Sequence, residues 1–409
     1  MYKEIKECRI CSSTNLKQVL SLGNQYLTGV FPKNVDENVT SGPVDLVWCP
    51  ESGLLQMKQT YSLEQMYGDN YGYRSGLNAS MVSHLEQKIK TLENIVKLSD
   101  SDLVIDIGSN DATSLKAYKG KHRKVGIDPT GSKFKEYYTD EITLIPDFFT
   151  AEKFKNIFPE EGAKIITSIA MFYDLESPMD FVKDIEHCLA EDGIWHFEQS
   201  YMPSMLKTNS YDTICHEHLE FYSLKVVKFM LEKNGLRIID VQMNSINGGS
   251  FAVTACKNNA KYISNNPVIN WLIEQENDMG LDTFKPYQEF AERAFKHRES
   301  LVRLIDSLVA DGKTVFGYGA STKGNVLLQF CNLTSKQIPF IAEVNEDKFG
   351  SFTPGSLIPI ISESEAKAMK PDYFLVLPWH FKNNILSREK EFIANGGKFI
   401  FPLPEIEII

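Results

Sequence analysis

The chain has 409 residues, of which 43% are hydrophobic and 24% charged, enough apolar material to build substantial cores in two or three domains. Its 43 basic and 54 acidic residues give a net charge of −11, which argues against a broad electrostatic surface for nucleic acid. A small, locally bound substrate is the better expectation.

No apolar run approaches the roughly 18 to 20 residues that cross a membrane. The first residues, MYKEIKECRICSS, lack the apolar centre of a signal peptide. We therefore expect a cytoplasmic protein with no membrane partner. Seven cysteines in a chain of this length do not form a disulfide framework, and an odd number cannot all pair within one chain, so most should be reduced thiols.

Residues 1–70 are predicted to form a small β-rich domain, because short apolar runs such as VDLVW and LLQMKQ are broken by Gly, Pro, Asn and Ser. Within it, Cys8 and Cys11 resemble half of a zinc knuckle, and Cys49 is a candidate third thiolate. Ser52 stands three positions after Cys49, so a closed tetrahedral site would need Glu51, Ser52, water or a distant group. Zinc and plain thiols therefore both stay open.

Residues 71–256 predict a doubly wound, mainly parallel sheet, because apolar strands alternate with amphipathic segments after a helical stretch over 81–98. The last two strands should pair as a hairpin at the sheet edge, since the turn formers Asn247, Gly248 and Gly249 separate them. The expected strands are 103–110, 124–129, 142–149, 163–170, 193–200, 236–243 and 250–257.

A cofactor site is predicted where the first of these strands ends in a polar turn at Gly108, which lets backbone approach a ligand closely. About twenty residues later, Asp128 ends the second strand, from which a carboxylate can bind both ribose hydroxyls of a nucleoside. No further glycine opens a pyrophosphate site, which favours S-adenosylmethionine over a dinucleotide; a turn with polar capping residues is the alternative. The predicted cofactor-binding residues are Asp106, Gly108, Asn110, Asp128, Asp147 and Phe148.

The densest polar cluster, residues 211–220, contains His216 and His218, which are candidate acid–base groups near the cofactor crevice. The two histidines are two positions apart rather than four, and the chain has no HExxH sequence, so this is no zinc helix. A surface or capping role carries equal weight. Tyr71 and Tyr73 could bring phenols to a substrate carbonyl, although tyrosines in a linker more often serve packing.

Residues 257–308 are mostly helical and highly charged, and 309–409 resume the alternation as a second Rossmann-like unit. Its first strand leads through a Gly-rich turn into a helix whose N–H groups, together with Lys323, suit a phosphate. The Walker spacing is missing, so a diphosphate ligand such as a nucleotide sugar fits without phosphoryl transfer. The expected substrate-binding residues are Tyr201, Tyr222, Asn247, Gly319, Ser321, Lys323 and Asn325.

Taken in order, these segments resemble the sugar C-methyltransferases that act on nucleotide-linked 4-keto deoxysugars. The matching segments are CRIC, YGYRSGLNASMVSHL, DIGSNDATSL, SIAMFYDLESP, EQSYMPSMLKTNSYDTICHEHLEFYSL, NGGSFAVTA, GYGASTKGN, FTPGSLIPI and VLPWHF, which span nearly the whole chain. The resemblance implies a small zinc-binding domain, a central S-adenosylmethionine domain and a Rossmann-like domain that holds much of the nucleotide sugar.

The resemblance also implies a mechanism, in which a histidine removes the proton beside the sugar ketone, typically at carbon 3, and the enolate attacks the methyl group of S-adenosylmethionine. His218 in the Glu217-His218 pair matches that base, Glu217 could orient it, and Tyr71 or Tyr73 could stabilise the enolate oxygen. O- or N-methylation of a nucleotide sugar, a nucleotide-sugar oxidoreductase and an inactive binding protein are the alternatives.

Three positions depart from the family pattern. Ser52 replaces the expected fourth zinc cysteine, Cys215 stands where relatives can carry a tyrosine, and Asp174 stands where some have a histidine. The first departure bears on the metal. The other two bear on the sugar and on whether carbon 3 or carbon 5 is methylated.

Overall fold

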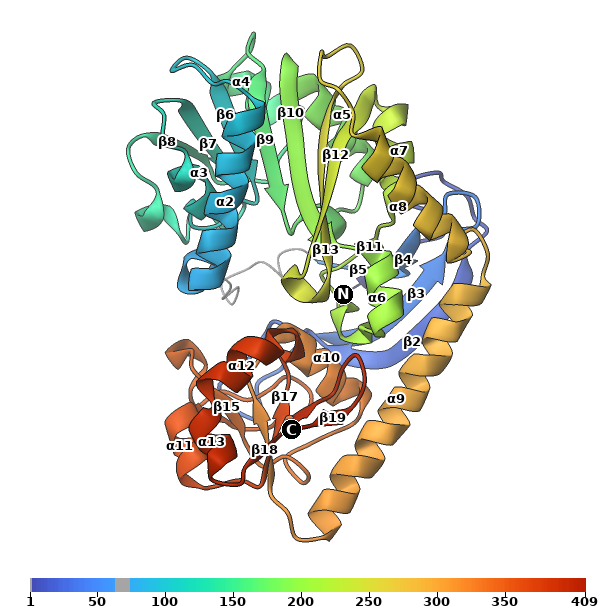
Figure 1. Ribbon diagram of the computed structural model, residues 1–409, viewed down its shortest axis with the longest axis vertical. Helices are drawn as coiled ribbons and strands as arrows, with labels where there is room; N and C mark the ends of the chain where they lie inside the picture. The colour runs from blue at the N-terminus through green and yellow to red at the C-terminus, as the bar shows by residue number, and fades with distance from the viewer. Residues whose placement is uncertain (1, 63–73) are drawn as a thin grey trace.

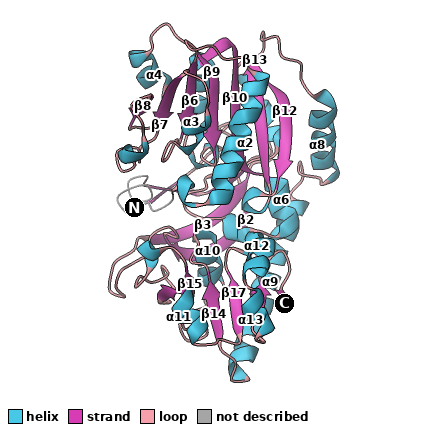
Figure 2. Ribbon diagram, turned by 60° about the vertical axis from the view of Figure 1, so that its left-hand side comes forward, coloured by secondary structure: helices cyan, strands magenta, loops and turns pink. Residues whose placement is uncertain are grey.

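The computed structural model describes residues 2–62 and 74–409 (Figure 1). Tyr71 and Tyr73 therefore lie outside the described residues. Two α/β units stand one above the other, and strands from the start of the chain run between them (Figures 1 and 2). None of the helices in the described part of the chain combines the length and apolarity needed to cross a bilayer.

The upper unit is a seven-stranded sheet of order β12-β13-β10-β9-β6-β7-β8. Its strands are β6 (Leu103–Ile107), β7 (Arg123–Ile127), β8 (Ile142–Ile145), β9 (Ala163–Ile169), β10 (Leu189–Ser200), β12 (Leu236–Asn244) and β13 (Ser250–Lys257). The five strands from β10 to β8 run parallel, whereas β13 is antiparallel to both β10 and β12. The predicted doubly wound sheet is confirmed, and so is its edge hairpin.

Helices cover both faces of this sheet, which explains why its strands are nearly continuous apolar runs. Successive residues of one strand point to opposite faces, so Val104 and Ile165 join one core while Ile105 and Ile166 join another. The helices of the unit are α2 (Ala79–Ile95), α3 (Thr113–Ala117), α4 (Ala151–Ile157), α5 (Pro178–Cys188), α6 (Met202–Thr208) and α7 (Leu224–Lys233).

The lower unit is a six-stranded sheet of order β16-β15-β14-β17-β18-β19, parallel except for the last strand. Its strands are β14 (Val315–Tyr318), β15 (Ile341–Glu343), β16 (Ile360–Ser362), β17 (Tyr373–Val376), β18 (Lys398–Phe401) and β19 (Glu407–Ile408). Its helices are α10 (Thr322–Phe330), α11 (Glu363–Ala368), α12 (Lys382–Arg388) and α13 (Lys390–Ala394). The predicted second Rossmann-like unit is therefore present.

Two helices connect the α/β units: α8 (Asn266–Asp278) and the long α9 (Lys285–Ala310). Figure 1 shows α9 running along one side of the molecule, past β2 and down to the lower unit. Near its start, Tyr287 stacks on Trp48 of the amino-terminal sheet with ring centroids 5.1 Å apart. One hydrophobic core consequently contains residues of the amino-terminal sheet, α6, α9 and the lower unit.

The amino-terminal part is β-rich, as predicted, but its larger sheet borrows a strand from the middle of the chain. Strands β1 (Tyr2–Glu4) and β5 (Gln59–Tyr61) pair separately. The four-stranded sheet has the order β11-β4-β3-β2, with β2 (Lys17–Tyr26), β3 (Ser41–Trp48), β4 (Leu55–Met57) and β11 (Glu220–Phe221). Strand β11 immediately follows the Glu217-His218-Leu219 segment, so the first part of the chain supports that segment directly.

Candidate active site

A cavity of about 980 Å³ lies where the three parts of the molecule meet. It opens at the carboxyl ends of the parallel strands of the upper unit, where ligands bind in open α/β sheets. Its lining includes Gly29, Phe31, Lys33, Asp106, Gly108, Asn110, Asp128, Phe148, Asp174, Glu198, Cys215, Glu217, His218, Asn247, Ser321, Lys323, Lys348 and His380.

One end of the cavity is formed by the turns after β6 and β7. Gly108 has φ +74°, a conformation that favours glycine, and a Cβ there would lie 3.1 Å from the side chain of Met171. Asp128 accepts the backbone N–H of Asn110 at 2.8 Å and that of Thr130 at 2.7 Å, and so holds the two turns together. A nucleoside with adjacent hydroxyls fits this arrangement of backbone and carboxylate.

Five of the six residues predicted for the cofactor line this end, and one does not. Asp147 lies outside the lining and pairs with Lys153, 2.7 Å from its Nζ. Asp106 is buried and accepts a hydrogen bond from Thr167 Oγ1 at 2.5 Å. Burial raises the pKa of Asp106 to about 7, and the charge of Asp128 adds to that effect.

The lining of the cavity also contains the Glu217-His218 pair. His218 Nδ1 lies 2.6 Å from the carbonyl oxygen of Thr213. A carbonyl can only accept, so Nδ1 donates this hydrogen bond, and Nε2 is the ring nitrogen left to accept a proton. The ring of Tyr173 meets the imidazole edge-on, with centroids 4.5 Å apart, and fixes its orientation further. The Thr213 carbonyl and the Tyr173 ring therefore hold the His218 imidazole in one orientation.

Glu217 also lines the cavity, close to the amino-terminal sheet. A Cβ on Gly29 would lie 2.9 Å from Glu217 Oε1, so a glycine allows this close approach. Burial raises the pKa of Glu217, whereas His218 nearby opposes that shift. The carboxyl group is thus placed beside the histidine in a poorly solvated position.

His216 does not reach the cavity, although its position in the cluster made it a candidate acid–base group. Its side chain is buried, and Nε2 donates to the carbonyl oxygen of Gln25 in β2 at 3.1 Å. Its ring meets that of Tyr61 edge-on with centroids 4.5 Å apart. Burial lowers the pKa of His216 to about 4. Residues 214–219 form an irregular turn rather than a strand, so residues two apart in this segment need not face the same side.

The amino-terminal sheet fixes the segment that carries His218. The Leu219 carbonyl accepts the N–H of Met57 in β4 at 2.8 Å, while the Leu219 N–H donates to the Tyr173 carbonyl at 2.8 Å. The next residue, Glu220, forms a fully buried ion pair with Arg9 at 3.5 Å. His218 is thus anchored on both sides by residues distant in the sequence.

Three lysines line the cavity beside the lower unit. Lys323 Nζ donates to the carbonyl oxygen of Asn247 at 2.6 Å, and burial lowers the pKa of Lys323 while Asp212 opposes that shift. Lys348 Nζ donates to the Ala320 carbonyl at 2.7 Å. Lys33 reaches over from the amino-terminal part and donates to the Asp347 carbonyl at 2.8 Å. Three ammonium groups therefore stand at this end of the cavity, where an anionic ligand would be stabilised.

Ser321, Lys323 and Asn247 line the cavity as predicted for substrate binding, but two of their neighbours do not. Gly319 lies beneath the turn with φ +82°, and a Cβ there would lie 2.8 Å from Pro378. Asn325 Nδ2 donates to the Thr28 carbonyl at 2.8 Å, which ties α10 to the amino-terminal part.

Tyr201 and Tyr222, also predicted for substrate binding, are buried away from the cavity. The hydroxyl of Tyr201 donates to Glu276 Oε1 at 2.7 Å, and Glu276 in turn accepts two backbone N–H groups at the start of α7. Tyr222 stacks on Phe172 with centroids 5.2 Å apart. Both tyrosines serve packing.

Several residues of the lining did not stand out as site residues in the sequence. Glu198 accepts hydrogen bonds from His84 Nε2 at 2.6 Å and from Asn244 Nδ2 at 2.6 Å, and pairs with Lys88 at 2.5 Å. Its position at the carboxyl end of β10 was a usable signal. Lys33 and Lys348 are single lysines in polar loops, so only the folded chain brings them together.

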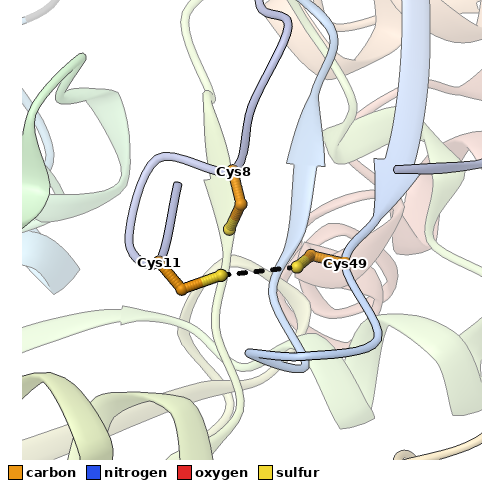
Figure 3. A group of neighbouring side chains, drawn as sticks. All are labelled: Cys8, Cys11 and Cys49. Atoms are coloured by element: carbon orange, nitrogen blue, oxygen red, sulfur yellow. Dashed lines mark hydrogen bonds between the residues drawn. The ribbon is translucent and has the colours of Figure 1, made fainter. Parts of the chain in front are cut away.

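The cysteine cluster lies apart from the cavity, in the amino-terminal part (Figure 3). The Sγ atoms of Cys8, Cys11 and Cys49 all lie within 4.8 Å of one another, and those of Cys11 and Cys49 are 3.6 Å apart. Three convergent thiols from two separate segments match the soft donor set that zinc prefers. The cluster is therefore compatible with a zinc ion.

Family models match three consecutive parts of the chain. Residues 8–67 match a model described as "Putative zinc binding domain", residues 81–241 match "Methyltransferase domain", and residues 245–404 match "C-methyltransferase C-terminal domain". Together they agree with the two α/β units and the cysteine cluster.

A full-length relative agrees with these matches. The C-methyltransferase NovU of Streptomyces niveus is 33% identical over 411 residues, covering 100% of this chain and 97% of that protein. Two solved structures match the chain in part: the mitomycin 7-O-methyltransferase MmcR (16% identity, 44% of this chain, 55% of that one, TM-score 0.34) and an S-adenosylmethionine-dependent methyltransferase from Clostridium acetobutylicum (11% identity, 43% and 92%, TM-score 0.35). By its full-length similarity to NovU, the chain belongs to the family of S-adenosylmethionine-dependent C-methyltransferases.

Proposed function

We propose that this C-methyltransferase methylates carbon 3 of a nucleotide-diphospho-4-keto-deoxysugar through an enolate, with His218 as the base. The observation that carries this proposal is the hydrogen bond from His218 Nδ1 to the Thr213 carbonyl, which leaves Nε2 of this cavity-lining histidine as the ring nitrogen available to accept a proton. A ketone acidifies the adjacent C–H bond, and a neutral imidazole is a suitable acceptor for that proton. Methylation at carbon needs such a base, whereas methylation of an amine does not.

The proposed step transfers the proton from carbon 3 to His218 Nε2. The C–H electron pair forms a carbon–carbon double bond, and the carbonyl electrons move to oxygen, giving the enolate. S-adenosylmethionine supplies an electrophilic methyl group; the carbon–sulfur bond breaks as the new carbon–carbon bond forms and the ketone returns. Glu217 orients the imidazole or the sugar, and Tyr71 or Tyr73 stabilises the enolate oxygen in this proposal.

The charges of the cavity support a diphosphate-linked substrate. Lys33, Lys323 and Lys348 line the cavity together with residues of the lower unit, and the turns proposed to bind the cofactor line it from the upper unit. Fixed ammonium groups bind phosphates, and the cavity as a whole has a volume of about 980 Å³. With the cofactor at one end and the nucleotide at the other, the sugar would lie at His218.

Solvent exchange tests the enolate directly. Incubation of the protein with a dTDP-linked 4-keto-6-deoxysugar in deuterated water, with S-adenosylhomocysteine in place of the methyl donor, should introduce deuterium at carbon 3. His218→Gln, which is close in size but not basic, should slow exchange and methylation by about 10²–10⁴-fold. His187→Gln, at an exposed histidine, is the matched control and should exchange like the wild type.

Three results would contradict the proposal. Deuterium at carbon 5 instead of carbon 3 would refute the carbon position. Undiminished exchange in His218→Gln would refute the base. A methyl group found on oxygen or nitrogen, with no exchange in any variant, would refute the enolate route as a whole.

A further inference from the structure

The cysteine cluster offers three sulfur donors, whereas a structural zinc site takes four ligands in a tetrahedron. The chain supplies Cys8-x-x-Cys11 from one segment but Cys49-x-x-Ser52 from the other. The identity of the fourth donor therefore decides what kind of site this is.

Ser52 lies where a fourth donor is needed. Its Oγ is 3.3 Å from Cys8 Sγ, and it also hydrogen-bonds with the thiol of Cys49. With Zn–S near 2.3 Å and Zn–O near 2.0 Å, tetrahedral ligands stand roughly 3.8 Å apart for two sulfurs and about 3.5 Å apart for sulfur and oxygen. The Cys11–Cys49 distance of 3.6 Å and the Cys8–Ser52 distance of 3.3 Å both approach these values.

Glu51 is the competing oxygen donor, but its carboxylate is held elsewhere. Its oxygens accept hydrogen bonds from Ser13 Oγ at 3.0 Å and Asn15 Nδ2 at 2.9 Å, on the exposed side of the loop. Oε2 comes within 3.4 Å of Cys49 Sγ. Within the described residues, however, the group whose ligand atoms all lie within 4.8 Å of one another contains the three cysteines and no carboxylate. Glu51 thus borders the cluster without completing it.

We propose that Ser52 Oγ is the fourth ligand, so that this chain binds zinc through three sulfurs and one oxygen. Cys8, Cys11 and Cys49 bind as thiolates and release their protons on metal binding, whereas the serine hydroxyl binds through an oxygen lone pair. One thiolate fewer makes the site less negative and its ligand set less soft, so zinc is bound more weakly than by four cysteines.

X-ray absorption at the zinc edge and metal competition with a chelator test this site on the purified full-length protein. The wild type should bind one zinc with three sulfur neighbours and one oxygen. Ser52→Cys should give four sulfur neighbours and lower the zinc dissociation constant at least about tenfold, and Ser52→Ala should raise it by a similar factor. Glu51→Gln, the matched control, should leave both measurements unchanged.

Four outcomes would overturn the proposal. They are a wild-type site with four sulfur neighbours, zinc lost from Glu51→Gln but not from Ser52→Ala, an unchanged dissociation constant in Ser52→Cys, and no zinc bound when the wild type is supplied with it. If Ser52→Ala fails to fold, Ser52→Cys still tests the proposal through its sulfur neighbours and its zinc dissociation constant. Because both readouts measure the metal, they are independent of the methylation proposal.

Discussion

Two histidines only two residues apart do different things in this protein. His218 faces the cavity and is held through Nδ1, whereas His216 faces the opposite side and donates through Nε2 to β2. The hydrogen-bond partner of each ring decides which nitrogen is available. A polar cluster in the sequence therefore contains one candidate base and one structural residue.

Because His216 is buried as a neutral ring, it should make stability depend on pH. Its folded-state pKa of about 4 lies below its ordinary value of about 6.5, so the unfolded chain binds the proton first. The stability that the neutral ring contributes is complete above about pH 6.5 and is lost as pH falls toward 4. Between pH 7.5 and 5, urea unfolding should show a loss of about 2 kcal/mol from this group.

His216→Gln keeps an N–H donor but cannot titrate, so its free energy of unfolding should fall less over the same pH range. His187→Gln, at an exposed histidine, should follow the wild-type slope. Equal slopes for all three proteins would show that His216 is not buried as a neutral ring.

Asp128 and Asp147 both end strands of the sheet, yet only Asp128 lines the cavity. Asp128→Asn should weaken binding of S-adenosylhomocysteine at least about tenfold, because an amide removes one acceptor from the two turns and the charge from the ribose position. Calorimetric titration measures this. Asp147→Asn should change the dissociation constant by less than about twofold; equal losses in both variants would contradict the assignment.

At the level of elements, β11 is the feature that connects the first part of the chain to the Glu217-His218 segment. A two-residue strand contributes few hydrogen bonds, so its position depends on the side chains beside it. Arg9 supplies these contacts: it pairs with Glu220 and donates to the Met57 carbonyl at 2.6 Å and to Thr60 Oγ1 at 2.9 Å. Arg9 lies between the two cysteines of the first pair, so the proposed zinc loop also positions this arginine.

Arg9→Met should therefore destabilise the protein by about 3 kcal/mol, because it leaves a buried acid and two buried acceptors without their partner. Burial already raises the pKa of Glu220 well above its usual range, and the charge of Arg9 is the largest of the effects that oppose this shift. Arg123→Met breaks an exposed pair with Glu161 and should cost less than about 1 kcal/mol in the same urea unfolding experiment. Similar losses in the free energy of unfolding in the two variants would mean that the buried pair contributes no more to stability than the exposed pair.

At the level of the whole molecule, hydrophobic periodicity was sufficient to predict the strands of the sheets. It was not sufficient to predict how distant parts of the chain pack against one another. All seven strands of the upper sheet and its hairpin could be predicted, because alternation of buried strands and amphipathic helices is a local property. The pairing of β11 with β4 could not be predicted, because a strand of two residues is too short to show a hydrophobic periodicity. The division of the chain into domains at residues 70, 256 and 308 stays a prediction. The pairing of β11 with β4 joins residues from both sides of the first of these boundaries.

The residues of the candidate site also divide into those that local sequence predicts and those that only tertiary packing brings together. Glycines and carboxylates at strand ends are predictable because the carboxyl ends of parallel strands share one edge, which accounts for Gly108 and Asp128. Tyr201 and Asn325 lie outside the cavity lining, because proximity in sequence to a site does not fix the direction of a side chain. Lys33 and Lys348 are 315 positions apart, and only tertiary packing brings both to the cavity.

Substitution of one of those lysines can show whether it contributes to substrate binding or to the chemical step. Phosphates bear the same charge before and during methyl transfer, so a lysine that binds them stabilises the ground and transition states equally. Lys348→Met should therefore raise KM for the nucleotide sugar about tenfold while kcat changes by less than about twofold, and it should leave S-adenosylhomocysteine binding unchanged. Lys336→Met, on the exposed surface of the same unit, should match the wild type. A fall in kcat at constant KM would instead put Lys348 at the reacting carbon, and the nucleotide would have to lie elsewhere.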